Sequence, residues 1–402
     1  MQPLTAPGRP QAPRGRWIWR LSGVVTFGAI GALGSLALVQ AQNPSSGPPP
    51  MSALPTRVVT VTAPVNALNV QSYGAPIKVT TVPGGPVRVA ESIMYTADGD
   101  GPPTVIDNDS GGLLTLAAPA CASSDCSVAF TVTVPAGVTV NAAADGAPVT
   151  VVGTGAADID SGGGPVYAAA IRGPLTVSSG GGEVTVNDAA SADLDSGGGP
   201  VTATGLSGKL TVLAEGGGVT VSRAPTADID SGGGPVYATA IGGPLTVNAE
   251  GGGVTVSGAG ATEIDSGGGP VTASTISGAL GVTAEGGGVQ ASGVTGALTV
   301  DTGGGPLSAT GLTSRSASVD GEGGGVTLGF TAAPTSVKVS TGGGDASLSV
   351  PGGPYAVTTD TGEPYSDAGG PNPAVVLVGT SPSAADSISV STDGGNLQIA
   401  PV

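Results

Sequence analysis

Carboxylates recur at regular intervals along the glycine-rich part of the chain, next to runs of three glycines. Aspartates lie two places before one set of runs, and glutamates lie one place before the intervening runs. They are Asp160, Asp195, Asp230, Asp265 and Asp301, and Glu215, Glu250, Glu285 and Glu322. Paired carboxylates can hydrolyse glycosides, and carboxylate oxygens are ligands for calcium. These residue types therefore suggest glycoside cleavage or cation binding.

The spacing of these acids argues against catalysis, because an active site interrupts a repeat and these carboxylates return in unit after unit. The chain contains no histidine, which removes histidine bases, histidine zinc sites and Ser-His-Asp triads. In calcium-binding nonapeptide repeats the aspartate follows the glycines, whereas here the acids precede them. We predict that the chain is not an enzyme and has no catalytic residue, cofactor or dedicated metal site. Weak cation binding along the acidic columns and a secreted, polysaccharide-cleaving β-helix are the alternatives.

The glycine runs define a repeat. Runs that start at residues 162, 197, 232 and 267 are 35 residues apart, and another run divides each interval. None of the runs ends in the Gly-Lys-Ser/Thr of a phosphate-binding loop. We interpret the glycines as corners that accept positive φ or close backbone approach. The predicted turn residues are Gly162, Gly197, Gly232, Gly267 and Gly303.

The elements between the glycine runs read as short strands. Val and Leu alternate with Thr, as in Leu245-x-Val247, which places the apolar side chains inward and Thr246 outward. Short strands can share a continuous core only when they stack. We predict an all-β, parallel β-helix-like solenoid with about 17–18 residues per coil. An antiparallel meander with glycine-rich hairpins is the alternative.

The alternation of aspartate and glutamate has an electrostatic reason in such a stack. Adjacent coils lie about 4.8 Å apart, so identical acids in every coil would repel one another. Alternation doubles that separation. Threonine columns on a solenoid also raise ice binding as an alternative, although here single threonines alternate with apolar residues along each strand.

The N-terminal segment predicts export. Residues 21–39 are uncharged and long enough to cross a bilayer, and the arginines before them should stay in the cytoplasm. We predict a basic cytoplasmic tail (1–20), a single transmembrane helix (21–39) and a Pro/Ser-rich linker (40–56). The C-terminal domain would then be extracellular. The alternative is a secreted protein that is cleaved near Ala41.

The exported body divides into two predicted β regions. Residues 57–141 contain alternating strands and the two cysteines, Cys121 and Cys126, which we expect to form a disulfide in an oxidising compartment. Residues 142–402 contain the glycine-rich repeats and closing strands. The body carries all 29 acids and only 8 of the 12 basic residues, so nucleic acid is excluded as a partner.

The body resembles a known family at three places. They are PVNALNVQSYGAPIKV at 64–79, TVPAGV at 133–138 and ISVSTDGGNLQIAPV at 388–402. Residues 57–402 are similar to the bacterial putative-adhesin family of Gly-rich β-strand-repeat proteins, a domain of unknown function. This chain has Gly-Gly-Gly where the family more often has Gly-Ser/Asp-Gly. The resemblance implies a cell-surface scaffold or adhesin-like module that contacts an extracellular protein or envelope component, and it supplies no catalytic residues.

Overall fold

The computed structural model describes residues 51–96, 105–118, 126–362 and 375–402, which belong to one compact unit. All the described elements are β-strands. Within these residues no helix is long and apolar enough to span a bilayer. The predicted basic tail (1–20) and transmembrane segment (21–39) lie outside the described residues, so the anchor stays a prediction.

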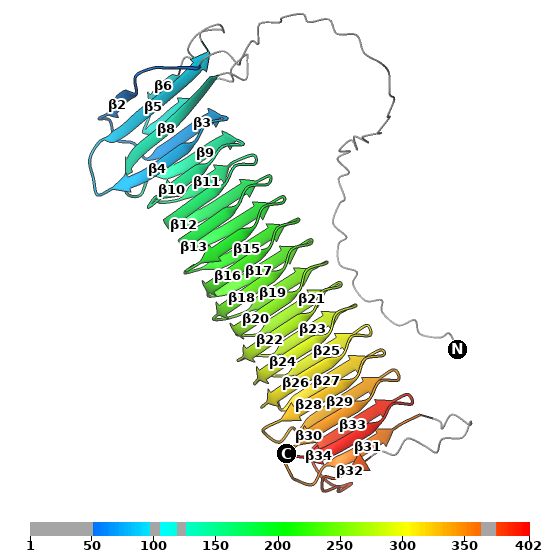
Figure 1. The fold of residues 1–402 in the computed structure, drawn as a ribbon. Helices are drawn as coiled ribbons and strands as arrows, with labels where there is room; N and C mark the ends of the chain where they lie inside the picture. The colour runs from blue at the N-terminus through cyan, green and yellow to red at the C-terminus, as the bar shows by residue number, and fades with distance from the viewer. Residues whose placement is uncertain (1–50, 97–104, 119–125, 363–374) are drawn as a thin grey trace, which may run out of the picture. The chain divides into compact units, whose positions relative to one another are not determined.

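The strands of the repeats stack in parallel into two facing sheets and form a β-solenoid of about 12 turns (Figure 1). Each coil adds one strand to each sheet. Val219 pairs with Val236, which pairs with Val254, so successive coils here are 17 and 18 residues long. The predicted solenoid and its coil length are confirmed, and the parallel pairing excludes the antiparallel meander for the repeats.

Two long strands pass around a corner and contribute to both sheets: β12 (Val166–Ser179) and β13 (Val184–Ser196). The first sheet also contains β10 (Val149–Val152), β14 (Val201–Thr204), β16 (Val219–Ala224), β18 (Val236–Ile241), β20 (Val254–Ala259), β22 (Val271–Ile276), β24 (Val289–Val294), β26 (Leu307–Leu312), β28 (Val326–Phe330) and β30 (Ala346–Val350). The second sheet also contains β9 (Thr139–Asp145), β11 (Ala157–Asp160), β15 (Lys209–Ala214), β17 (Thr226–Ser231), β19 (Leu245–Ala249), β21 (Thr262–Ser266), β23 (Leu280–Ala284), β25 (Leu298–Thr302), β27 (Ser316–Gly321) and β29 (Ser336–Thr341).

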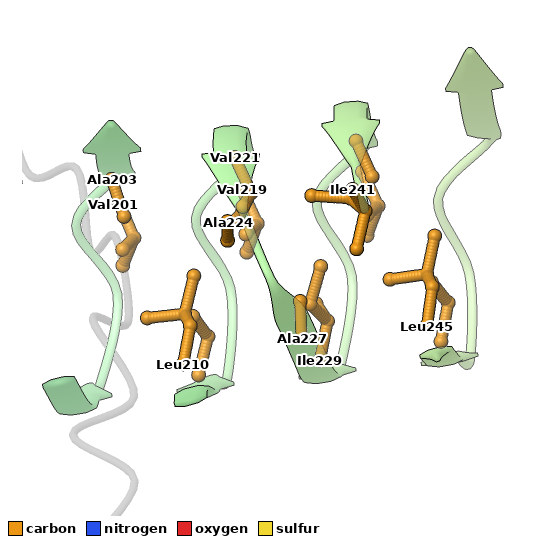
Figure 2. Packing of buried hydrophobic residues seen from close by; sticks show 14 of the residues in the cluster. Val201, Ala203, Leu210, Val219, Val221, Ala224, Ala227, Ile229, Ile241 and Leu245 are labelled. Atoms are coloured by element: carbon orange, nitrogen blue, oxygen red, sulfur yellow. The ribbon is translucent and has the colours of Figure 1, made fainter. Parts of the chain in front are cut away.

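Apolar side chains from both sheets fill the interior. Figure 2 shows Val201 and Val219 of the first sheet and Leu210 and Leu245 of the second projecting into the same space. All four are at most 1% exposed. The predicted inward positions are therefore confirmed, because side chains alternate across each strand.

In some columns of the core, large and small residues alternate from coil to coil. Ile241 lies between Ala224 and Ala259 in the first sheet. The second sheet shows the reverse, with Ala227 between two leucines. Interiors pack at crystal-like density, so in these columns a large side chain is matched by a small neighbour in the next coil. The 35-residue period of the sequence therefore has two causes, which are packing in the core and repulsion between the acids.

The corner that holds the glycine runs has a constant length. Each second-sheet strand has a first inward residue, and the first inward residue of the following first-sheet strand comes nine positions later. This holds in every coil from β9 to β30, as from Ala227 to Val236. A Cβ on Gly269 would overlap the carbonyl oxygen of Gly252 in the preceding coil. Close backbone approach therefore selects glycine at this corner.

The predicted turn glycines serve two different needs. Among Gly162, Gly197, Gly232, Gly267 and Gly303, only Gly162 adopts a left-handed φ, of +63°. At the other four positions a Cβ would press on a backbone carbonyl oxygen of the preceding coil. The prediction of corner positions is correct, and crowding rather than positive φ is the main reason for glycine.

The opposite corner varies in length. It spans eight or nine residues in most coils, ten from Leu307 to Ala317 and eleven from Val326 to Val337. One residue in each of many successive coils adopts left-handed φ here, including Arg223, Ala240, Gly258, Thr275 and Gly293 with φ of +55° to +68°. This column was not predicted, because its members are not part of a glycine run.

Both ends of the stack depart from chain order. The N-terminal strands are β1 (Met51–Ala53), β2 (Arg57–Val61), β3 (Ala67–Tyr73), β4 (Ile77–Val82), β5 (Val87–Thr96), β6 (Ile106–Ser110), β7 (Leu113–Ala117) and β8 (Cys126–Pro135). The β3–β4 coil lies between the β7–β8 coil and the β9–β10 coil. Antiparallel β5 and β6 then cover the outer edges of β8 and β7. The predicted division at residue 141 falls inside β9.

The C-terminal strands are β31 (Ala356–Asp360), β32 (Val375–Val376), β33 (Ser387–Thr392) and β34 (Leu397–Pro401). The predicted closing pair, β33 and β34, pairs with β29 and β30 on one side. On the other side it pairs with β31 and β32. The last residues of the chain therefore form the penultimate coil of the stack.

A buried serine braces many glycine corners from inside. The hydroxyls of Ser196, Ser231 and Ser266 donate to the carbonyl oxygen three residues on, at 2.8, 3.0 and 3.0 Å. The equivalent Ser161 hydroxyl is buried and has no hydrogen-bond partner in the described structure. These serines belong to the Asp-Ser-Gly-Gly-Gly string, and their role is to hold the turn.

We predict that Gly269→Ala destabilises the protein by about 1–3 kcal/mol, because its Cβ would overlap backbone of the preceding coil. Gly268→Ala is the matched control, since its nearest atom is the Glu250 carbonyl oxygen at 4.0 Å. It should change stability by no more than about 0.5 kcal/mol. Thermal unfolding followed by circular dichroism measures both. Equal melting temperatures for the two variants would contradict the crowding argument.

We predict that Ser266→Ala destabilises by about 1 kcal/mol, because it leaves the buried Gly269 carbonyl oxygen without this donor. Ser161→Ala removes a buried hydroxyl that makes no hydrogen bond, so its stability should be unchanged or higher. Denaturant unfolding of the two variants provides the measurement. A larger loss of stability for Ser161→Ala than for Ser266→Ala would refute the stabilisation of the turn by the serine hydroxyl.

Candidate functional site

Each sheet of the solenoid presents an outward row at every second residue. We call the outward residues of the first sheet, from β12 to β30, the hydroxyl face. Its first column is Tyr167, Thr185, Thr202, Thr220, Tyr237, Thr255, Thr272, Gln290, Ser308, Thr327 and Ser347. Its second column is Asn187, Thr204, Ser222, Thr239, Ser257, Ser274, Ser292 and Thr310. None of these residues carries a charge.

The outward residues of the second sheet form what we call the acidic face, from β11 to β27. Asp160, Asp195, Asp230 and Asp265 lie in one column of it and are exposed. Neutral residues separate them, as Asn248 does between Asp230 and Asp265. The predicted alternation is confirmed for these four. Asp301 departs from it, because it pairs directly with Asp320.

The predicted glutamates do not share this column. Glu215, Glu250, Glu285 and Glu322 are exposed at the glycine corner, each beside the first glycine of the following run. A Cβ on Gly267, for example, would approach the carbonyl oxygen of Glu250 at 2.5 Å. The two sets of acids therefore form separate columns, and the structure does not bring them together into one site.

A further acidic column, which was not predicted, lies two residues before the aspartates. It contains Asp158, Asp193, Asp228 and Glu263, which alternate with neutral residues in the same way. The strings A-D-I-D, A-D-L-D and E-I-D carry the signal, since residues two apart share a face. Every second coil therefore presents two carboxylates on one strand.

The acidic columns lie open to solvent. Lys209 Nζ lies 3.8 Å from Asp228 Oδ2, and both side chains are about half exposed, so this ion pair contributes little stability. Among the described residues, no three acidic or cysteine side chains gather in a way that could hold a metal ion. The columns present repeated negative charge rather than a coordination site.

The second column of the hydroxyl face was also not anticipated. The sequence showed the outward threonines as single rows. In the structure a second outward residue, Thr, Ser or Asn, follows two positions later on the same strand, as Thr204 follows Thr202. Thr204 Oγ1 and Ser222 Oγ, in adjacent coils, are 3.0 Å apart and hydrogen-bonded. This contact links the hydroxyls of the second column between two neighbouring coils.

A shallow groove of about 400 Å³ runs along the hydroxyl face over β22, β24, β26, β28 and β30. Its floor includes Thr272, Gln290, Ser308, Thr327 and Ser347 of the first column. Pro270, Pro306 and Asp345 line it at the glycine corner. The Asp345 carboxylate accepts a hydrogen bond from the Asn396 N–H at 2.7 Å.

Two tyrosines stand on the same face outside the groove. Tyr167 and Tyr237 are 43% and 49% exposed and occupy the first column. They occupy equivalent positions in coils that lie two 35-residue periods apart. Among the described large apolar side chains, most of the other exposed ones lie near the ends of the stack.

The cluster around Glu91 is a different kind of feature. Glu91 is fully buried in β5 and neither of its carboxylate oxygens has a hydrogen-bond partner in the described structure. Arg57 Nη1 lies 3.5 Å from Glu91 Oε2, and the Arg57 guanidinium also donates to Asp107. Burial raises the pKa of the Glu91 carboxyl, the Asp107 charge raises it further, and Arg57 opposes both.

The predicted disulfide involves one described residue. Cys126 begins β8, where it is half-buried and lies opposite Tyr95 of β5. Its expected partner Cys121 lies outside the described residues. The disulfide therefore stays a prediction.

Comparison with known proteins gives distant structural likenesses only. No family model matches the chain, and no curated protein matches it. A putative adhesin from Parabacteroides merdae is 13% identical, covers 70% of this chain and 96% of its own, and has a TM-score of 0.26. One from Parabacteroides distasonis is 15% identical, with coverage of 71% and 98% and a TM-score of 0.24.

A putative cell adhesion protein from Clostridium sporogenes is 8% identical, covers 87% of this chain and 99% of its own, and has a TM-score of 0.17. Likenesses at these values assign no activity to this chain. A function must therefore be argued from the two faces of the solenoid.

We predict that Glu91→Gln stabilises the protein at neutral pH. Because the folded-state pKa of Glu91 is raised, the folded protein holds this proton more tightly than the unfolded chain. The contribution of Glu91 to stability is thus greatest below the usual glutamate pKa and falls as the pH rises through the raised value. The gain from Glu91→Gln should shrink as the pH is lowered towards 4.

Thermal melting of both proteins between pH 4 and pH 8 tests this. Glu263→Gln, on the exposed acidic face, is the matched control and should not reproduce the pH-dependent gain. A Glu91→Gln variant that melts below the wild type at pH 7 would show that the Arg57 contact outweighs the burial.

Proposed function

We propose that this protein is a membrane-anchored extracellular solenoid that acts as an adhesin-like contact module. The observation that carries the proposal is the hydroxyl face, which repeats the same uncharged polar side chains over successive coils. Repetition of weak contacts along one rigid face raises the overall avidity without a deep pocket.

The chemistry of the outward residues supports contact rather than catalysis. The hydroxyl face bears Thr, Ser, Asn, Gln and Tyr. Thr185 Oγ1 donates to the exposed Glu183 carboxylate at 3.3 Å, but most other coils have Pro or Gly at the position of Glu183. The carboxylates of the acidic face recur in the same arrangement in alternate coils and point outward from an open sheet. A glycosidase instead needs one carboxylate pair on either side of a bound sugar.

The position outside the membrane is part of the proposal. It is supported by the uncharged segment 21–39 behind a basic tail, and by the acidic, glycine-rich body that follows. Cleavage near Ala41 would release the same body from the cell. The contact role applies in either case, and the anchored form would act as a scaffold in the envelope.

We predict that protease treatment of intact cells removes the body of the full-length protein and leaves the basic tail in the membrane fraction. Immunoblotting with tags at the two ends of the chain measures this. Deletion of residues 21–39 is the control and should leave the whole protein protected inside the cell. A wild-type C-terminal tag that resists protease on intact cells would contradict the proposed location.

A further inference from the structure

We propose that the hydroxyl face binds a linear, uncharged polysaccharide, with the groove over β22 to β30 as its main site. The inference rests on the proposed contact function and names its ligand class. The groove follows the stacking direction across five strands. At about 4.8 Å per coil it is about 19 Å long, which suits an extended polymer better than a compact small molecule.

Charge selects against other polymers. The chain has a net charge of −17, and the acids of the solenoid concentrate on the acidic face and at the glycine corner. Polyanions are repelled by such a molecule, and polycations would be drawn to the acidic columns instead. The two columns of the hydroxyl face carry no charge, so the ligand that complements them is itself uncharged.

The lining of the groove matches sugar hydroxyls. Thr272, Ser308, Thr327 and Ser347 each offer a hydroxyl that can donate and accept, and Gln290 offers an amide. Asp345 is the one acidic residue among the lining residues, and its carboxylate already accepts the Asn396 N–H. The polar groups recur once per coil, so they can follow a polymer whose own hydroxyls recur along its length.

Apolar surfaces complete the site. The rings of Pro270 and Pro306 form one wall of the groove. Further along the same column, Tyr237 and Tyr167 expose aromatic rings, which can pack against the apolar faces of sugars. Protein interfaces depend instead on clustered, desolvated aromatic and Arg anchors, and the described hydroxyl face has no such cluster.

The test uses the purified full-length chain and insoluble β-glucan, mannan and xylan, with a polygalacturonate gel as the acidic polymer. Depletion of the protein from solution measures binding. We expect retention on at least one neutral polymer and none on polygalacturonate. Ser308→Lys, which fills the groove, should weaken retention at least tenfold.

Thr299→Lys is the matched control, because Thr299 is an equally exposed hydroxyl on β25, on the opposite sheet of the same region. It should bind as the wild type does. Melting curves of both variants confirm that they are folded. Tyr237→Ala should weaken retention on the long polymer but not binding of a short oligosaccharide, because Tyr237 lies outside the groove.

Three outcomes would overturn the proposal: no retention on any neutral polymer, retention on polygalacturonate alone, or equal loss of binding in Ser308→Lys and Thr299→Lys. Inhibition of ice recrystallisation without retention on any polysaccharide would also overturn it, in favour of an ordered-water surface. Protease treatment of intact cells reports exposure independently, so failure of the ligand proposal and failure of the proposed location are distinguishable.

Discussion

The close approach of successive backbones at the glycine corner is the constraint on which the rest of the solenoid depends. At Gly252, Gly269 and Gly287 a side chain would overlap a carbonyl oxygen of the coil before it. Nothing but backbone fits at these three positions, and every coil from β9 to β30 turns in the same nine residues. The strands on either side of the corner are thereby held in one register, and their inward side chains fall into continuous columns.

A constant register does not by itself give a well-packed interior. The two-coil period of the sequence meets this packing requirement. Identical coils would place identical side chains about 4.8 Å apart, which would put isoleucine against isoleucine in the column of Ile241 and acid against acid on the outer surface. Alternation of Ile241 with Ala224 and Ala259 solves the steric problem inside. Alternation of Asp230 and Asp265 with Asn248 solves the electrostatic problem outside. One period thus satisfies packing and charge together.

Sequence alone predicted the features that depend on local periodicity, namely the strands, the coil length and the glycine corner. It missed the second hydroxyl and acidic columns, although the period-two rule that assigns Asp228 and Asp230 to one face was available. Glu91 also occupies an inward position in the alternation Val87, Val89, Glu91. The coil order at both ends was beyond prediction, because insertion of β3–β4 between β7–β8 and β9–β10 depends on pairing between distant segments.

The two corners constrain the chain differently, and this difference explains how such a chain can carry a function. The glycine corner keeps its nine residues from β9 to β30. The opposite corner lengthens from eight residues to eleven, with a register shift between β26 and β28 at Ala309 and Leu312. The core constrains only the inward half of each strand, so the outward half is free to vary. Folding therefore does not require the two outward columns of one sheet to be free of charge while the outward columns of the other collect acids. An asymmetry that the fold does not need, kept over successive coils, is best explained by what the two faces contact.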